Sequence, residues 1–403
     1  MRMRRLFLSP LIILLATTHV VAQEMPRIEA SPSQASVSAA GAPTIEALPS
    51  PVTVRLRGLS AVDANIAWAS GREGTVLRTT DAGKTWSVFK VPGAEKLDFR
   101  DVEGFSADEA VILSIGPGED SRVYRTSDGG QSWVLVLRNP DVEGFFDCMD
   151  FEGAEGRLLG DPVRGRFQLF ASSDGGRSWR WTKGPRAKKD EAAFAASGTC
   201  VIRVGKGTAI VTGGARTRAH YLPDQFEKRG DWHALDVQSA HSPSTGLFSV
   251  AHREESLLAV GGDYKQEQAP GLAFGFRASD GWVHSDGRSR RWDAVLFDRW
   301  SYVDGMPSGY RSGIACRQQP PEDCVATGPG GNDFLVHTQS GYEAKGIEEP
   351  KGERKSFSID DIGVASRWQS IPGIGYDSVD VADGVFWFSG DGGRLGRLVL
   401  PLQ

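Results

Sequence analysis

The sequence predicts an all-β protein that folds as a single seven-bladed β-propeller with four-stranded antiparallel blades. Three observations lead to this prediction. First, the 403 residues include 49 glycines and 11 tryptophans but only 5 methionines, a composition that favours tight turns and aromatic strands over helices. Second, a turn motif recurs with aspartates at positions 81, 128 and 174, a spacing typical of propeller blades. Third, glycine-rich strand endings continue along the rest of the chain.

The N-terminus has the pattern of a cleaved export signal, which we place at residues 1–22. Arg2, Arg4 and Arg5 precede the apolar run 6–16, and residues 20–22 offer a cleavage site. The run is too short to span a bilayer comfortably, and no later stretch approaches the roughly 20 apolar residues of a membrane helix. We therefore expect a periplasmic or secreted protein with no transmembrane segment after cleavage. A retained anchor is the alternative, and the arginine pair leaves ordinary secretory and twin-arginine export both open.

Residues 23–50 are rich in Ala, Ser and Pro, so we expect a flexible leader here, followed by the propeller at 51–403. Hydrophobic residues make up 40% of the chain and charged residues 24%, which is sufficient for a large core. The formal net charge of -5 argues against a nucleic-acid partner, because such binding needs a concentrated basic surface. We expect a monomer.

The repeated motif predicts a structural turn between the third and fourth strands of a blade. Residues 79–86, 126–133 and 172–179 all fit the pattern [S/T]xDxGx[S/T]W. The Asp side chain can accept hydrogen bonds from backbone amides, the Gly can adopt a positive φ, and the Trp can pack on the neighbouring blade. We favour this role over a catalytic or metal-binding one. The residues concerned are Asp81, Gly83, Trp86, Asp128, Gly130, Trp133, Asp174, Gly176 and Trp179.

Seven second-strand endings define the blades, at residues 69–71, 114–116, 159–161, 212–214, 260–262, 327–329 and 389–391. Later blades keep only a tryptophan of the motif, at Trp232, Trp292 and Trp368. The last blade lacks a fourth strand, so we expect an N-terminal strand from about residues 51–56 to close the ring. The polar stretch 341–366 is expected to be a surface insertion.

The three motifs resemble the Asp-box (BNR) repeat of sialidases, sortilin-type receptors, xyloglucanases and the photosystem II stability/assembly factor family. Residues 74–81, where an apolar third strand leads directly into the motif, look most like the last family. This resemblance implies an exported, non-catalytic scaffold for protein binding or assembly. Some members carry an oxidoreductase label, but the chain has no GxGxxG unit on a βα turn, no CxxC and no haem-attachment motif. We expect no cofactor.

Ligands of propellers usually bind the face opposite these motifs, which carries the loops after each second strand and before each inner strand. The candidates there are Arg72, Arg100, Asp147, Asp161, Arg164, Arg216, Asp263, Tyr264, Tyr310, Arg311, Tyr376 and Asp377, with Glu73, Glu191 and Arg394 beside them. They either pair as salt bridges around a solvated channel mouth or form a docking surface for an acidic peptide or glycan. The scattered histidines and the lack of Asp-rich loops predict no metal site.

A glycoside hydrolase of the sialidase type is the alternative function. The family resemblance would then imply Arg72, Arg100 and Arg311 as carboxylate ligands, Tyr376 as nucleophile and Asp161 as acid. The Tyr/Phe-Arg-Ile-Pro motif of sialidases is incomplete, since residues 26–28 read only Pro-Arg-Ile, and xyloglucanases pair two propellers whereas this chain holds one. Enzyme function is therefore the less favoured prediction.

Four cysteines in an exported chain can form two disulfides. Cys148 and Cys200 lie in the predicted inner strands of adjacent blades, and Cys316 and Cys324 flank a turn within one hairpin. We pair them in this way, with four buried free thiols as the alternative.

Overall fold

The computed structural model describes residues 43–400 except 206, 224–229, 238, 240–241, 254–255, 277–302, 305, 319–322 and 338–365. The predicted signal peptide, most of the predicted leader, Trp292 and nearly all of the predicted insertion at 341–366 lie outside the described residues. No helix within the described part of the chain has the length and apolar character needed to cross a membrane.

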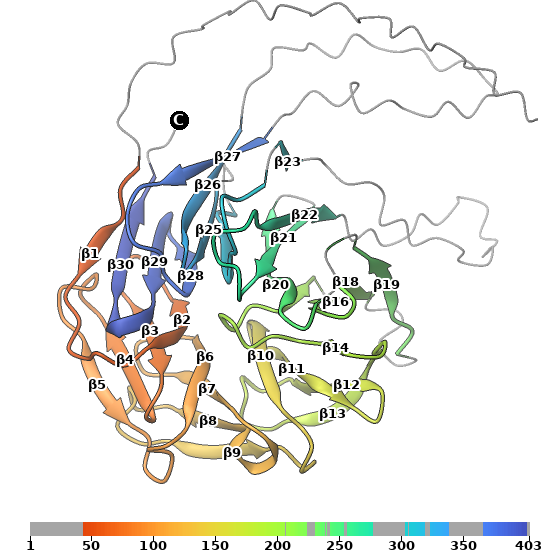
Figure 1. Cartoon of the computed structure of the whole chain (residues 1–403). Coiled ribbons are helices and arrows are strands. Elements are labelled where there is room, and N and C mark those ends of the chain that lie inside the picture. Colours follow the sequence, from red (N-terminus) through yellow and green to blue (C-terminus); the bar gives the residue numbers. More distant parts are fainter. Residues whose placement is uncertain are drawn as a thin grey trace, which may run out of the picture. The chain divides into compact units, whose positions relative to one another are not determined.

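The first four sheets follow the chain as consecutive antiparallel blades (Figure 1). Blade 1 contains β2 (Leu56–Ala61), β3 (Ala67–Gly71), β4 (Thr75–Thr79) and β5 (Ser87–Lys90). Blade 2 contains β6 (Asp98–Gly104), β7 (Ala110–Ile115), β8 (Arg122–Thr126) and β9 (Val134–Arg138). Blade 3 contains β10 (Phe146–Glu152), β11 (Glu155–Val163), β12 (Arg166–Ser172) and β13 (Arg180–Arg186). Blade 4 contains β15 (Val201–Val204), β16 (Gly207–Val211), β18 (Arg218–Leu222) and β19 (His233–Asp236).

The last three sheets add short extensions to the same plan. Blade 5 contains β20 (Thr245–Arg253), β21 (Ser256–Asp263) and β22 (Leu272–Phe276), extended at its inner edge by β17 (Gly213–Gly214) and β14 (Glu191–Ala192). Blade 6 contains β24 (Gly313–Cys316), β25 (Cys324–Gly328), β26 (Gly331–His337) and β27 (Ser366–Ile371), and β23 (Val303–Asp304) pairs in parallel with β27. Blade 7 contains β28 (Ser378–Ala382), β29 (Val385–Ser389) and β30 (Leu395–Val399), with β1 (Glu46–Leu48) beside β30. Two short 3₁₀ turns, Gly118–Asp120 and Asp391–Gly393, complete the described elements that bear on the site.

The inner strands close into a ring, which confirms the predicted seven-bladed β-propeller with four-stranded antiparallel blades. Strands β2, β6, β10, β15, β20, β24 and β28 each contact the next, and β28 contacts β2. As predicted, a strand from the N-terminal side completes the last blade, because β1 pairs antiparallel with β30. The predicted position of this strand at residues 51–56 is wrong: Leu56 begins β2. Leu48, within the predicted leader, instead packs against apolar side chains of blades 1 and 7, and Ile45 packs against those of blades 6 and 7.

The three motifs form nearly identical turns. In the first, Asp81 Oδ1 accepts hydrogen bonds from Thr85 N and Thr79 Oγ1, both at 2.9 Å, and Asp81 Oδ2 accepts one from Thr85 Oγ1 at 2.6 Å. The same bonds recur around Asp128 and Asp174. The motif glycines adopt positive φ angles, with Gly83 at 81°. These bonds occupy the carboxylates within the turn, so their role here is structural.

The motif tryptophans mostly join one blade to the next. Trp86 lies edge-on to Trp387 of blade 7 at 6.1 Å between ring centroids, and Trp133 lies edge-on to Trp68 of blade 1 at 6.4 Å. Trp179 instead contacts Phe151 of its own blade at 5.6 Å. Each contact buries aromatic surface near the face that carries the motifs.

Side chains on the inner strands bond the backbone of the next blade. Carboxylates do this at three junctions: Asp101 Oδ2 accepts from Met149 N at 2.6 Å, Asp150 Oδ2 from Arg203 N at 2.5 Å and Asp380 Oδ2 from Ala61 N at 2.7 Å. Hydroxyls serve elsewhere, for example Ser249 Oγ, which accepts from Ile314 N at 2.9 Å. The ring is therefore held by directed bonds as well as by apolar packing.

Both disulfides have the pairing expected from the sequence. Cys148 on β10 bonds Cys200 just before β15, which links blades 3 and 4 across 52 residues. Cys316 and Cys324 are directly opposite each other on β24 and β25, with their Cα atoms 4.0 Å apart. No free cysteine occurs among the described residues.

Candidate functional site

A cavity of about 510 Å³ lies where the inner strands begin. The third strand of a blade runs in the same direction as the inner strand, so the motif turn that follows it lies at the end away from the start of the inner strand. The cavity is therefore on the face opposite the motifs, as the sequence predicted for a ligand site. All seven blades or the segments joining them contribute to its wall. The lining residues are Arg55, Arg57, Arg100, Phe145, Asp147, Asp161, Ala192, Ala193, Phe194, Ala195, Ala196, Phe248, Tyr264, Glu267, Tyr310, Ser312, Pro329 and Asp377.

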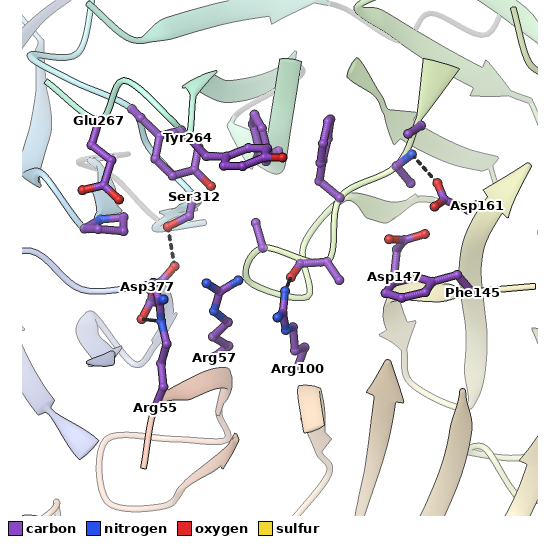
Figure 2. A pocket seen from close by; sticks show the side chains of 18 residues that line it. Arg55, Arg57, Arg100, Phe145, Asp147, Asp161, Tyr264, Glu267, Ser312 and Asp377 are labelled. Atoms are coloured by element: carbon purple, nitrogen blue, oxygen red, sulfur yellow. Dashed lines mark hydrogen bonds and ion pairs between the residues drawn. The ribbon is translucent and has the colours of Figure 1, made fainter. Parts of the chain in front are cut away.

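Three arginines from blades 1 and 2 form the cationic side of the cavity (Figure 2). Arg55 is held by Asp377, with 2.9 Å from Nε to Oδ2 and 2.5 Å from Nη2 to Oδ1. Arg100 donates from Nε to Asp98 Oδ2 and from Nη1 to Ala195 O, both at 3.0 Å. These bonds hold two of the three guanidinium groups in fixed positions.

Arg57 differs, because its guanidinium makes no hydrogen bond or ion pair with any described residue, and its buried Nε has no partner there. Burial, together with the like charges of Arg100 and Arg55, lowers the pKa of Arg57 to about 10. The group is still cationic at neutral pH. An unpaired, half-buried cation beside two others is a site that an anion would stabilise.

Two carboxylates from blade 3 form the acidic side. Asp147 on β10 is 1% exposed, and its Oδ2 has no hydrogen-bond partner among the described residues. Asp161 on β11 is half-buried, and its Oδ1 accepts a hydrogen bond from Ala193 N at 3.0 Å. Burial raises the pKa of Asp147 well above its ordinary value, with the charge of Asp161 adding to the effect, and burial raises the pKa of Asp161 to about 6. The two groups therefore resist simultaneous ionisation.

Aromatic rings from blades 4, 5 and 6 form the third side. The ring centroids of Phe194 and Phe248 are 4.3 Å apart, and Phe248 lies edge-on to Tyr310 at 4.9 Å. Tyr264 stands at the rim, 40% exposed, within 6.2 Å of Phe248. In Figure 2 Tyr264 lies across the cavity from Arg57 and Arg100. The cavity thus combines a cationic, an acidic and an aromatic side.

The structure brings half of the predicted binding-face residues to the cavity. Those that line it are Arg100, Asp147, Asp161, Tyr264, Tyr310 and Asp377. Arg72 instead lies outside, 55% exposed and 3.6 Å from Asp98, and Arg164 is 85% exposed beside Asp141. Arg216 is exposed on a loop, and Asp263 accepts a hydrogen bond from Lys265 N within its own turn. Glu191 is buried and bonded to Arg218 and His220.

The predictions for Arg311 and Tyr376 as exposed site residues are wrong. Arg311 is fully buried, and its Nε donates to Asp333 Oδ2 at 2.7 Å. Tyr376 is 6% exposed and packs on Phe388 at 5.2 Å. Arg311 turns toward Asp333 of blade 6, and Tyr376 packs among apolar side chains of blades 6 and 7. Long side chains next to an inner strand can turn into the blade as readily as toward the channel.

The residues of the glycosidase alternative are consequently not gathered in one place. Arg100 and Asp161 line the cavity, whereas Arg72, Arg311 and Tyr376 do not. The described residues also contain no cluster of three or more His, Cys, Asp or Glu side chains able to hold a metal ion.

Sequence reasoning missed Arg55, Arg57, Phe145, Phe194, Phe248, Glu267 and Ser312, all of which line the cavity. A signal for several of them was present. The first residues of an inner strand and those just before it lie at the channel, so neighbours of a predicted candidate at such a position are candidates too. The cavity contains three pairs of residues at or just before the starts of inner strands: Arg55 with Arg57, Phe145 with Asp147, and Tyr310 with Ser312.

No protein-family model matches the chain, and no curated protein matches it. Solved structures do match. One is YCF48 bound to D1 peptide, at 16% identity and a TM-score of 0.55, covering 91% of this chain and 100% of that one. Another is YCF48 from Cyanidioschyzon merolae, at 15% identity and a TM-score of 0.52, covering 88% and 99%. A third is an ancestral GH74 enzyme, at 12% identity and a TM-score of 0.53, covering 88% of this chain but 46% of that one. At these identities the likeness shows the fold alone.

Proposed function

We propose that this protein is an exported, non-catalytic β-propeller that binds an acidic segment of a partner protein in its cavity and acts as an assembly or stability scaffold. The observation that carries the proposal is the unpaired guanidinium of Arg57, which lies between Arg55 and Arg100. A carboxylate seated there would accept charge-assisted hydrogen bonds and relieve the repulsion among the three cations.

The wall of the cavity suits a peptide. The cavity has a volume of about 510 Å³, and both arginines and aromatic side chains line it. Such rings supply large rigid contact areas, and arginine and tyrosine are frequent anchors of protein interfaces.

Two further findings support a scaffold of this kind. The motif resemblance to the photosystem II stability/assembly factor family agrees with the fold shared with YCF48, whose solved structure contains a bound D1 peptide. Two disulfides are compatible with the oxidising compartment that an exported chain would reach. We therefore retain the export signal and the periplasmic or secreted location as part of the proposal.

Binding of a fluorescent peptide of alternating alanine and glutamate tests the proposal. Arg57→Ala should weaken binding by about tenfold or more, because a desolvated cation is lost. Arg138→Ala is the matched control: it removes an equal charge from the outer strand β9, where Arg138 pairs with Glu119. No measurable binding by the parent protein, or equal binding by parent and Arg57→Ala, would contradict the proposal.

A glycoside hydrolase is the weaker candidate. Asp147 and Asp161 are two cavity carboxylates with raised pKa values, and glycosidases use a pair of carboxyl groups. The ancestral GH74 enzyme shares the fold. A panel of sialosides and plant glucans decides between the two functions. Turnover that disappears in Asp161→Asn would establish the enzyme and remove the non-catalytic proposal.

A further inference from the structure

We propose that the acidic side of the cavity is a second recognition point, which binds an ammonium group such as a lysine side chain. The ligand would then carry an acidic and an amino group together, one for each side. This inference rests on the proposed function for the location of the binding site, but it assigns a separate group of residues and a separate part of the ligand.

The first step is the hydrogen-bonding state of the carboxylates. Asp147 Oδ2 is buried without a partner among the described residues. Asp161 makes one hydrogen bond, through Oδ1 to Ala193 N at 3.0 Å, which leaves Oδ2 for the cavity. A buried acceptor without a donor is costly, so this pair is incomplete until a donor or a proton reaches it.

The second step is that no described cation is bonded to the carboxyl groups of Asp147 and Asp161. Arg100 is the nearest cation that acts on Asp147, but its Nε bonds Asp98 and its Nη1 bonds Ala195 O. Arg55 is held by Asp377. The remaining charged groups that face the cavity are Arg57 and Glu267. The described residues therefore supply no positive charge that is bonded to the pair, and we assign this charge to the ligand.

The third step is the choice of ammonium over other donors. Phe145 lies beside Asp147 in the cavity wall, and the chain segment that bonds Asp161 also carries Phe194 (Figure 2). Ring faces attract cations, and a carboxylate next to them adds a charge-assisted hydrogen bond. The arginines repel a cation from their own side, so the two sides select opposite charges.

Without a ligand, the carboxyl groups of Asp147 and Asp161 hold a proton, and ligand binding should release it. Burial raises the pKa of both carboxyl groups, and the charge of Asp161 adds to the effect on Asp147. When an ammonium group binds, the proton held by Asp147 and Asp161 is released to solvent. The charge of the ammonium group then replaces the charge of that proton. Binding should therefore release up to one proton at pH 6.

The experiment uses two peptides of alternating alanine and glutamate that differ at one central residue, lysine or acetyl-lysine. The parent protein should bind the lysine peptide about tenfold more tightly, because only the lysine peptide carries the ammonium. Asp161→Asn and Asp147→Asn should each abolish this preference. Asp263→Asn, on the same face but outside the cavity, should keep the preference. Calorimetry in two buffers of different ionisation enthalpy measures the released proton.

A small probe separates this inference from the proposed function. N-acetyl-lysine methylamide is titrated by NMR into the parent protein and into Asp161→Asn. Binding that depends on Asp161 supports the ammonium site even if neither peptide binds, in which case the proposed function alone fails. Equal affinity for the lysine and acetyl-lysine peptides overturns this inference and leaves the acidic-segment proposal standing. Absence of binding by every probe overturns both.

Discussion

Arginine plays opposite roles at two positions near the cavity. Arg57 is unpaired, whereas Arg311 is fully buried and donates to Asp333, to Ser308 and to the Tyr310 carbonyl. Burial lowers the pKa of Arg311, although the charge of Asp333 opposes the effect. The same residue type therefore provides a binding group in one place and part of the core in another.

The first prediction follows from the burial of Arg311. Arg311→Ala should destabilise the fold by about 3 to 5 kcal/mol, because it leaves the Asp333 carboxylate buried without its cation. Urea denaturation measures the change. Arg164→Ala, at an 85% exposed position, is the control and should unfold like the parent. A parent-like midpoint for Arg311→Ala would show that Asp333 finds another partner.

Sequence alone could not separate these two arginines. Both lie at the start of an inner strand, and both positions suit either a channel-facing or a blade-facing side chain. The difference depends on Asp333, which lies in β26, on a different strand of blade 6 from the one that Arg311 precedes. Contacts between distant segments of this kind are invisible to residue spacing.

At the scale of elements, the motif was the most informative feature of the sequence. Its Asp, Gly and Trp each have a structural role within a single turn. Three turns and the direction of the neighbouring strands could therefore be predicted. The same reasoning located the face of the cavity. The closing strand was misplaced because the average composition of residues 23–50 concealed a short apolar pattern at Ile45 and Leu48.

The two disulfides differ in what they hold together, and this gives the second prediction. Cys148–Cys200 closes 52 residues and joins two blades, whereas Cys316–Cys324 closes 8 residues within one hairpin. In the chain-entropy view, loss of the first should cost about 4 kcal/mol and loss of the second about 2 to 3 kcal/mol. Denaturation of the two double Cys→Ala variants measures the difference. Equal costs would show that loop length does not govern their contributions.

The third prediction concerns the edge strand β1. Deletion of residues 1–50 removes its pairing with β30 and the packing of Leu48 on blades 1 and 7. The truncated protein should melt several degrees lower and expose a β30 edge open to pairing with other chains. Deletion of residues 1–42 alone is the control and should leave the melting temperature unchanged. If both truncations melt alike, β1 does not stabilise the closure of the ring.

For the whole molecule, the ring of inner strands sets the dependence of stability on pH. Asp150 and Asp380 bond the backbone of the next blade, yet burial raises the pKa of each to about 6. Burial also raises the pKa values of Asp101 and Glu103, which face the same acids. Between about pH 4 and 6 the folded protein therefore binds more protons than the unfolded chain, and stability rises as the pH falls through this window.

Other carboxylates act in the opposite direction at lower pH. Burial alone would raise the pKa of Glu191, but hydrogen bonds from His220 and Arg218 lower it to about 2. Hydrogen bonds from Ser132 and Ser178 lower the pKa values of Asp128 and Asp174 to about 2. The stability these groups provide is complete above their ordinary pKa and is lost as the pH falls toward 2.

The fourth prediction is a stability maximum near pH 5. From pH 7.5 to pH 5, each of Asp150 and Asp380 should add on the order of 1 kcal/mol to the free energy of unfolding. Stability should fall again toward pH 3, because below about pH 4.5 the unfolded chain binds protons at Glu191 that the folded protein does not. Urea unfolding midpoints measured from pH 3 to pH 7.5 give this dependence of stability on pH. Asp380→Asn should flatten the rise toward pH 5, because the amide does not titrate and its one oxygen can replace only one of the two acceptors that Ala61 N and Val381 N use. If the urea midpoint of the parent is instead highest at pH 7.5, Asp150 and Asp380 stay ionised in the folded ring. Groups other than the backbone amides that bond them would then stabilise their negative charges.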